Sequence, residues 1–234
     1  MNLAKGCSPR VAIRFCTMLF DLDGTLIDTK ELIVASFRHA IKQVLGRDYP
    51  DEVYLAGQGR PLIDQMRSFD AKRAEELAAV YSEFNYRYHD RLIREFPGIG
   101  ALLADLVAAG VRLGVVTSKK RRGAELGLRH FGLEAYLSTA VFMEDTQEHK
   151  PHPAPVREAL RRLGVRPEEA VMVGDSPFDI ESALAAGTEA VGVAWGAHPP
   201  DRLREAGAAV VCYTVAELRA YLLGPRFPSS PHCS

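Results

Sequence analysis

The chain has 234 residues, 47% of them hydrophobic and 25% charged, which is enough to bury an α/β core and to carry a small second module. Its 29 lysines and arginines are balanced by 30 aspartates and glutamates, so the overall charge offers nothing to attract nucleic acid. The only early apolar stretch is too short for a membrane span and lacks a signal-peptide cleavage pattern, and the four cysteines form no C-x-x-C pair. We therefore expect a cytoplasmic protein with neither a nucleic-acid nor a membrane partner. No pattern in the chain indicates an oligomeric state.

The first predicted strand, residues 15–21, delivers two acids to its carboxyl end. A mostly apolar run from Val11 stops at Asp21, as expected for a buried parallel strand, and open α/β sheets bind ligands at that edge. Period-two alternation directs Asp21 and Asp23 to one side, where both can meet one substrate and one metal. Two acids this close repel each other, so Mg2+ or a shared proton is needed to hold them. The alternative is an ordinary Asp-x-Asp-Gly turn without a site.

The next segment, residues 28–96, is an insert in which no strand pattern occurs. Its apolar positions recur at helical spacing, so we predict a helical module between the first two strands of the sheet. These positions are Leu77, Val80, Tyr81, Phe84 and Tyr88. We interpret the aromatic ones as the core of the module itself.

Strands and helices alternate after Pro97, as a parallel sheet requires. The predicted strands are 112–117, 139–144, 170–175, 190–194 and 209–213. The predicted helices are 99–109, 122–131, 154–163, 178–186, 200–206 and 215–223. The segment 224–234 is rich in proline and serine and is predicted to be a disordered tail.

Further polar residues lie after these strands or in the loops between them. Thr117 and Ser118 end the second strand, where hydroxyl and backbone N–H groups can bind a phosphate, although such residues also cap helices. Lys150 lies in a proline-bounded loop, where a solvated surface charge is the common alternative. Asp175 ends a later strand, and Asp179 follows in the first turn of the next helix.

With strand-acid-acid, strand-Thr, loop-Lys and strand-acid-acid in this order, the chain resembles the haloacid dehalogenase superfamily of phosphatases. The resemblance runs over residues 15–223 and is poorest in the segment 48–60. It implies an α/β fold with a Rossmann-like parallel sheet core and an inserted small α-helical cap domain. The core would comprise residues 11–27 and 97–223, and the cap would comprise residues 28–96.

The resemblance also implies catalytic roles for the acids. Asp21 would be the nucleophile that forms an aspartyl-phosphate. Asp23 would protonate the leaving oxygen and then take a proton from the attacking water. Mg2+ would be held by Asp21, the backbone carbonyl of Asp23 and Asp175, an oxygen-only set that suits this hard cation.

The transferring phosphoryl group would be bound by Thr117, the Ser118 backbone and Lys150, because a carboxylate can approach a phosphate only where positive charge surrounds it. Asp179 would orient Lys150 or a metal-bound water. Arg60 lies in a segment that matches the family's glycine-proline cap loop, which faces the site, so it would touch a distal phosphate of the substrate.

Within the superfamily, the segments 20–33, 84–90 and 168–195 are similar to bacterial inorganic pyrophosphatases. We therefore expect a Mg2+-dependent phosphohydrolase whose small-molecule substrate is pyrophosphate, cleaved to two phosphates. Phosphoglycolate phosphatase is the alternative, followed by a phosphosugar mutase and a non-catalytic sensor of phosphorylated metabolites. The cationic run 119–122 would attract an anionic substrate if it faced the site, but we interpret it as the solvated start of a helix.

Overall fold

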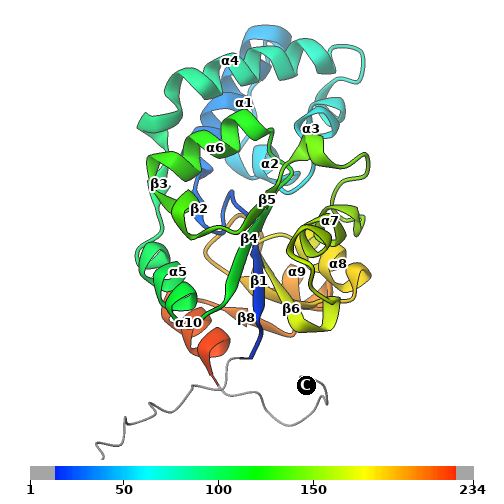
Figure 1. The fold of residues 1–234 in the computed structure, drawn as a ribbon. Coiled ribbons are helices and arrows are strands. Elements are labelled where there is room, and N and C mark those ends of the chain that lie inside the picture. The colour runs from blue at the N-terminus through cyan, green and yellow to red at the C-terminus, as the bar shows by residue number, and fades with distance from the viewer. Residues whose placement is uncertain (1–13, 225–234) are drawn as a thin grey trace, which may run out of the picture.

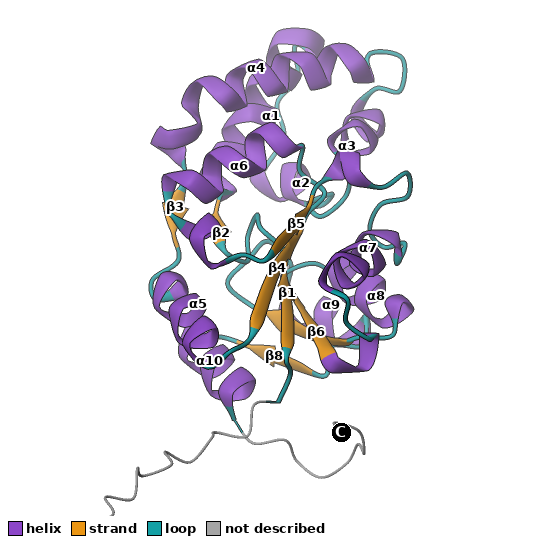
Figure 2. Cartoon of the chain, in the orientation of Figure 1, coloured by secondary structure: helices purple, strands orange, loops and turns teal. Residues whose placement is uncertain are grey.

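The computed structural model describes residues 14–224, which form a parallel sheet with helices on both faces and four further helices beyond its carboxyl edge (Figure 1, Figure 2). The strands run in the order β5-β4-β1-β6-β7-β8, and every neighbouring pair is parallel. Their bounds are β1 Thr17–Phe20, β4 Arg112–Val116, β5 Thr139–Val141, β6 Ala170–Gly174, β7 Glu189–Val193 and β8 Val210–Cys212. The predicted α/β fold is confirmed. The predicted tail beyond Gly224 and residues 11–13 of the predicted core lie outside the described residues.

The side chains of β1 alternate between two hydrophobic cores, one on each face of the sheet. Met18 and Phe20 belong to a core that also contains residues of α5, α6 and α10, whereas Leu19 belongs to a core with residues of α7, α8 and α9. Burial on both faces explains why the strands appear in the sequence as continuous apolar runs. The helices are α5 Ile99–Ala108, α6 Arg121–His130, α7 Ala154–Leu163, α8 Pro177–Ala186, α9 Pro200–Glu205 and α10 Val215–Leu223.

The insert folds around a third hydrophobic core. Its helices are α1 Lys30–Leu45, α2 Asp51–Leu55, α3 Leu62–Phe69 and α4 Ala74–Leu92. The buried Phe37 ring lies 4.9 Å from the ring centroid of Tyr81 and 6.0 Å from that of Tyr54. The apolar positions predicted at helical spacing all lie on α4, and Leu77 is fully buried in this core. Among residues 14–224, no helix combines the length and the apolar composition needed to cross a membrane.

The prediction of an insert without strands is wrong at its two ends. β2 (Ile27–Asp28) and β3 (Arg94–Glu95) form an antiparallel ribbon in which Ile27 lies opposite Glu95. The ribbon ties together the two connections between the sheet domain and the helices above it (Figure 2). Strands of two residues are too short to show alternation, so the sequence pattern gave no sign of them.

The predicted strand 139–144 is too long by three residues. β5 ends at Val141, and Met143–Asp145 forms a 3-10 turn because the Asp145 carboxylate accepts a hydrogen bond from the Phe142 N–H at 2.9 Å. Side-chain bonds of this kind compete with strand formation.

Candidate active site

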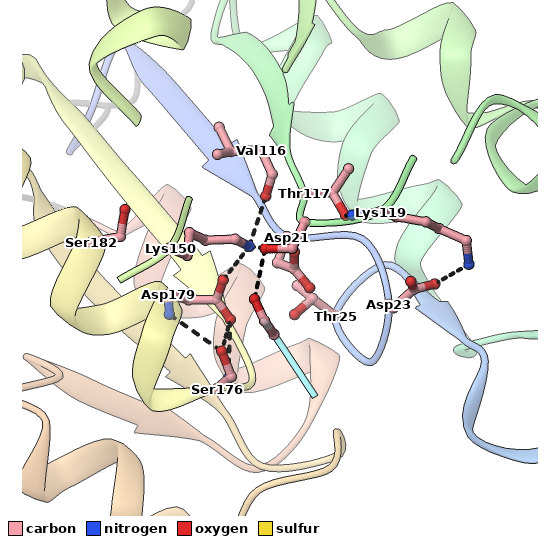
Figure 3. Close-up of polar contacts among 12 residues, drawn as sticks. Asp21, Asp23, Thr25, Val116, Thr117, Lys119, Lys150, Ser176, Asp179 and Ser182 are labelled. Carbon is pink, nitrogen blue, oxygen red and sulfur yellow. Dashed lines mark hydrogen bonds and ion pairs between the residues drawn. The ribbon is translucent and has the colours of Figure 1, made fainter. Parts of the chain in front are cut away.

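The carboxyl edge of the sheet brings together residues from three loops. β1 lies between β4 and β6, and the loops after these strands begin with Asp21, Thr117 and Asp175. The Asp21 N–H donates to the Val173 carbonyl at 2.9 Å and the Thr117 N–H donates to the Val141 carbonyl at 3.0 Å, so both residues extend the hydrogen bonding of the strands. Because parallel strands end at one edge, these side chains become neighbours, and Figure 3 shows Asp21 and Thr117 there.

Lys150, from the loop between β5 and α7, is buried at the centre of the site. Its ammonium group donates to Asp21 Oδ1 at 2.6 Å, to Asp179 Oδ1 at 2.5 Å and to the Val116 carbonyl at 3.0 Å. An ammonium group has three N–H donors, so these bonds use all of them. Only 2% of Lys150 is exposed, and the position of its charge is therefore fixed. The structure thus places this lysine in the site rather than on the solvated surface.

Asp179 is held by the N-terminus of α8 as well as by Lys150. Its Oδ2 accepts hydrogen bonds from the Ser176 hydroxyl at 2.6 Å and the Ser176 N–H at 3.1 Å, while the Asp179 N–H donates back to the Ser176 hydroxyl. This is a capping box with Pro177 at the first helical position. One carboxylate oxygen therefore starts the helix, and the other pairs with Lys150.

Asp175 is fixed by a hydroxyl and a backbone amide. Its Oδ1 accepts from the Thr25 hydroxyl at 3.2 Å, and its Oδ2 accepts from the Ala197 N–H at 2.8 Å. A Cβ on Gly24 or Gly196 would come within 2.4 or 2.2 Å of the same Oδ2. Gly24 also has a φ of 87°, so the backbone can approach this carboxylate only where a side chain is missing.

Three buried carboxylates and one lysine make a site that fits a hard cation. Oxygen atoms of Asp21, Asp175 and Asp179 lie within 4.8 Å of one another. Burial raises the pKa of Asp21 from 3.8 to about 7 although Lys150 opposes the shift, and burial together with Asp21 and Asp179 raises the pKa of Asp175 well above 3.8. One ammonium group cannot balance three carboxylates, and an oxygen-only set of ligands is the kind that Mg2+ takes.

Asp23 lies on the other side of Asp21 from this cluster and pairs with a different lysine. Lys119 Nζ donates to Asp23 Oδ1 at 2.8 Å, and the two side chains are only 14% and 17% exposed (Figure 3). The backbone of Lys119 is held on both sides, since its N–H donates to Thr117 Oγ1 and its carbonyl accepts from the Met143 N–H, each at 3.1 Å. The interpretation of residues 119–122 as a solvated run is therefore wrong for Lys119.

The loop between α2 and α3 docks the insert onto this edge. Gln58 Nε2 donates to the Asp23 carbonyl at 3.1 Å, and the Ser118 hydroxyl donates to the Gly59 carbonyl at 2.6 Å. Gly59 has a φ of 98°, and a Cβ there would lie 2.6 Å from Ser176 Oγ. The loop therefore packs against the sheet domain more closely than any residue other than glycine allows.

A pocket opens between the sheet edge and the insert. Its lining includes Asp21, Asp23, Thr117, Ser118, Lys119 and Lys120 from the sheet side and Phe37, Gln58, Arg60, Leu62, Tyr81 and Asn85 from the insert. The guanidinium carbon of Arg60 lies 5.8 Å from the Phe178 ring centroid, and the buried Arg60 Nε has no hydrogen-bond partner among the described residues. Arg60 is thus the cation that the insert contributes to the pocket.

The structure brings together nearly all the residues singled out in the sequence, with two differences in their arrangement. Asp179 contacts Lys150 as expected and its carboxylate also belongs to the cluster, whereas the Asp23 carboxylate stands apart from it. The Ser118 hydroxyl contacts the insert, whereas only its backbone was expected to contribute. Sequence reasoning missed Gln58 and assigned no role to Ser176, although the Ser-x-x-Asp pattern of a capping box was available for the latter.

Known proteins resemble this chain over most of its length. A family model described as haloacid dehalogenase-like hydrolase matches residues 18–193. A pyrophosphatase PpaX of Bacillus velezensis is 40% identical over 82% of this chain and 93% of its own length. A pyrophosphatase PpaX of Bacillus pumilus is 44% identical over 76% of this chain and 83% of its own length. The crystal structure of a predicted phosphatase from Clostridium acetobutylicum matches with a TM-score of 0.82 at 27% identity, covering 89% of this chain and 98% of that one. The crystal structure of a predicted phosphoglycolate phosphatase from Haemophilus somnus 129pt matches with a TM-score of 0.78 at 26% identity, covering 87% of this chain and 96% of that one.

Proposed function

The chain belongs to the haloacid dehalogenase-like hydrolases and is a phosphatase of that family, and we propose that it cleaves pyrophosphate to two phosphates through a phosphorylated Asp21. The observation that carries this proposal is the arrangement about Asp21. A buried lysine fixes one of its oxygens, two further buried carboxylates lie beside it, and Asp23 lies in the same pocket.

Asp21 would act as the nucleophile. Its Oδ1 is occupied by Lys150, whereas its second carboxylate oxygen accepts no hydrogen bond from any described residue. That oxygen would attack the phosphorus while the bond from phosphorus to the bridging oxygen breaks. Thr117 and the Ser118 backbone, at the end of β4, would bind the oxygens of the transferring phosphoryl group.

Mg2+ would be held by Asp21, Asp175 and Asp179 together with the Asp23 carbonyl, and when bound it supplies the positive charge that phosphoryl oxygens need. The chain's own residues keep these ligands in place. Thr25 and the Ala197 N–H hold Asp175, and the capping box of α8 holds Asp179.

Asp23 would give a proton to the departing phosphate and later take one from the water that hydrolyses the phosphorylated Asp21. It is two residues from the nucleophile and lines the same pocket.

Because pyrophosphate has no organic part, its second phosphate must be recognised by cationic and hydrogen-bonding groups. Arg60 and Gln58 supply such groups from the insert.

Two measurements test the proposal. Purified enzyme with Mg2+ should release two phosphates per pyrophosphate, and Asp21→Asn should keep the fold but retain less than about 1% of the turnover, because the amide loses the nucleophilic charge. Borohydride reduction during turnover, followed by peptide mass spectrometry, should convert Asp21 to homoserine in the wild type. Substantial activity in the Asn variant, or reduction at another residue, would refute Asp21 as the nucleophile.

Phosphoglycolate is the second candidate substrate, because the pocket cations Arg60 and Lys119 also suit a carboxylate and one structural relative is described as a predicted phosphoglycolate phosphatase. We expect pyrophosphate to have the higher kcat/KM. The reverse order would replace pyrophosphate by phosphoglycolate while leaving the nucleophile and the metal ligands unchanged.

A further inference from the structure

We propose that Lys119 binds the leaving group of the substrate, and that the enzyme is therefore selective for phosphate compounds whose leaving group carries an anionic charge of its own. The proposal deepens the proposed function and rests on it in one respect, namely that Asp23 is the residue next to the leaving oxygen. Lys119 would be a specificity-determining residue from the sheet domain, whereas the family resemblance pointed only to the cap loop for this task.

The buried Lys150 and the partly buried Lys119 have different freedom to meet a substrate. All three donors of Lys150 are used by Asp21, Asp179 and the Val116 carbonyl. The Lys119 ammonium has a single ion-pair partner among the described residues, Asp23, so two of its donors remain for a ligand. The two ammonium groups lie on opposite sides of Asp21 (Figure 3). Lys119 is thus on the side where Asp23 would meet the leaving oxygen.

The position of Lys119 is built into the fold. Its N–H and carbonyl are both hydrogen-bonded, and its side chain lies along Gly123, where an added Cβ would come within 3.1 Å of Lys119 Cε. The side chain is 14% exposed, whereas a surface lysine would extend into water. A long flexible cation that is folded inward and held beside a catalytic acid is positioned to contact a bound anion.

The charges of the pocket support an anion at this end. Lys119 and Lys120 from the sheet domain and Arg60 from the insert line it beside the carboxylates of Asp21 and Asp23, while its other insert-side members, such as Gln58, Tyr81 and Asn85, are uncharged. When the bond to the leaving group breaks, negative charge grows on the oxygen beside Asp23. A cation already fixed there stabilises this charge without reorganisation.

Three substrates separate recognition of the leaving group from other roles of Lys119. Pyrophosphate has a leaving group that is anionic in the substrate and needs a proton to depart. Ethyl phosphate has a leaving group that is uncharged in the substrate and needs a proton. The leaving group of p-nitrophenyl phosphate is also uncharged in the substrate, but it departs without a proton. For Lys119→Met we expect kcat/KM to fall by about 30-fold or more for pyrophosphate and by less than about 3-fold for p-nitrophenyl phosphate. The fall in kcat/KM for ethyl phosphate should be smaller than the fall for pyrophosphate by a factor of at least about 10. Lys119→Arg should recover part of the loss, and Lys42→Met, an exposed lysine at the end of α1, should change nothing.

If Lys119→Met lowered kcat/KM equally for pyrophosphate and ethyl phosphate, the proposal would be overturned, because Lys119 would then act only by positioning Asp23. Equal losses for all three substrates would overturn it as well, in favour of a structural role. Binding gives an independent readout: the inhibition constant of methylenediphosphonate should rise about 10-fold or more in Lys119→Met, and that of inorganic phosphate should not. If the wild type does not cleave pyrophosphate, the proposed function fails, and the diphosphonate comparison still decides the role of Lys119.

Discussion

Removing Mg2+ from the wild type should make the stability of the fold depend on pH in an unusual direction. Most acids in a folded protein are stabilised as carboxylates, so proteins lose stability as the pH falls. Here burial raises the pKa of Asp21 from 3.8 to about 7 and raises that of Asp175 in the same direction. A carboxyl whose folded-state pKa is raised takes up a proton on folding. Without metal, the protein should therefore gain stability as the pH falls from 8 to 5.

The size of this gain in stability follows from the pKa of Asp21. Below about pH 7 the folded protein holds a proton on Asp21 that the unfolded chain releases until the pH approaches 3.8. Each pH unit in this window adds about 1.4 kcal/mol, so the change from pH 8 to pH 5 amounts to about 3 kcal/mol from this residue alone. In a chain of this size that corresponds to a rise in Tm of roughly 6 to 12 °C. Excess Mg2+ at pH 8 should raise the free energy of unfolding by a similar amount, about 2.7 kcal/mol at a Mg2+ concentration of 100 times its Kd.

The assay is urea denaturation in EDTA at pH 5, 6, 7 and 8, with Asp21→Asn measured in parallel. His198 acts in the opposite direction, because burial lowers its pKa and its contribution is lost as the pH falls through 6.5. The difference between wild type and Asp21→Asn cancels this contribution. Carboxylates with a lowered pKa, such as Glu158, lose their contribution only below about pH 4.5 and stay outside the window. A wild-type stability that falls from pH 8 to pH 5 relative to the variant would refute the reasoning.

Two further substitutions test the lysine and the docking loop. Lys150→Met leaves three buried carboxylates without their cation, so we expect a loss of about 3–5 kcal/mol at pH 8 by urea denaturation, partly recovered at pH 5, together with loss of turnover. A cost below about 1 kcal/mol would mean that water reaches the cluster. Gly59→Ala should push the docking loop away from Ser176 and raise KM for pyrophosphate by about 10-fold or more, and the strained positive φ should also cost about 1–3 kcal/mol of stability. Gly46→Ala is the matched control, since Gly46 also has a positive φ but has nothing within 4 Å, and an equal effect on KM would show that docking is not involved.

The parts of the fold that could be predicted from the sequence are those set by local burial. The central strand shows a continuous apolar run because Met18, Leu19 and Phe20 face two different cores and all are fully buried. Asp21 and Asp175 stand out because each ends such a run abruptly. The predicted helix 154–163 matches α7 at both ends, where Pro153 precedes it and Gly164 follows with a left-handed conformation.

The parts that could not be predicted depend on contacts between segments distant in the chain. Lys119 belongs to a run of four basic residues, and nothing local separates it from Arg121, whose guanidinium pairs with Asp145 at 47% exposure. Only the approach of Asp23, 96 residues earlier, gives Lys119 a different environment. Gln58 is a similar case, because its hydrogen bond to the Asp23 carbonyl exists only when the insert lies on the sheet.

Asp21 divides the site into two halves that differ in how firmly they are held. On one side, Lys150 and Asp179 belong to the buried core and to the start of α8, so a change there alters the fold together with the chemistry. On the other side, Asp23 and Lys119 face a loop that is attached through a few hydrogen bonds, among them the bond from Ser118 to Gly59. Substitutions in that loop can change which leaving group fits while the nucleophile keeps its position. The leaving-group half is therefore where proteins with this nucleophile and this cluster can differ in substrate.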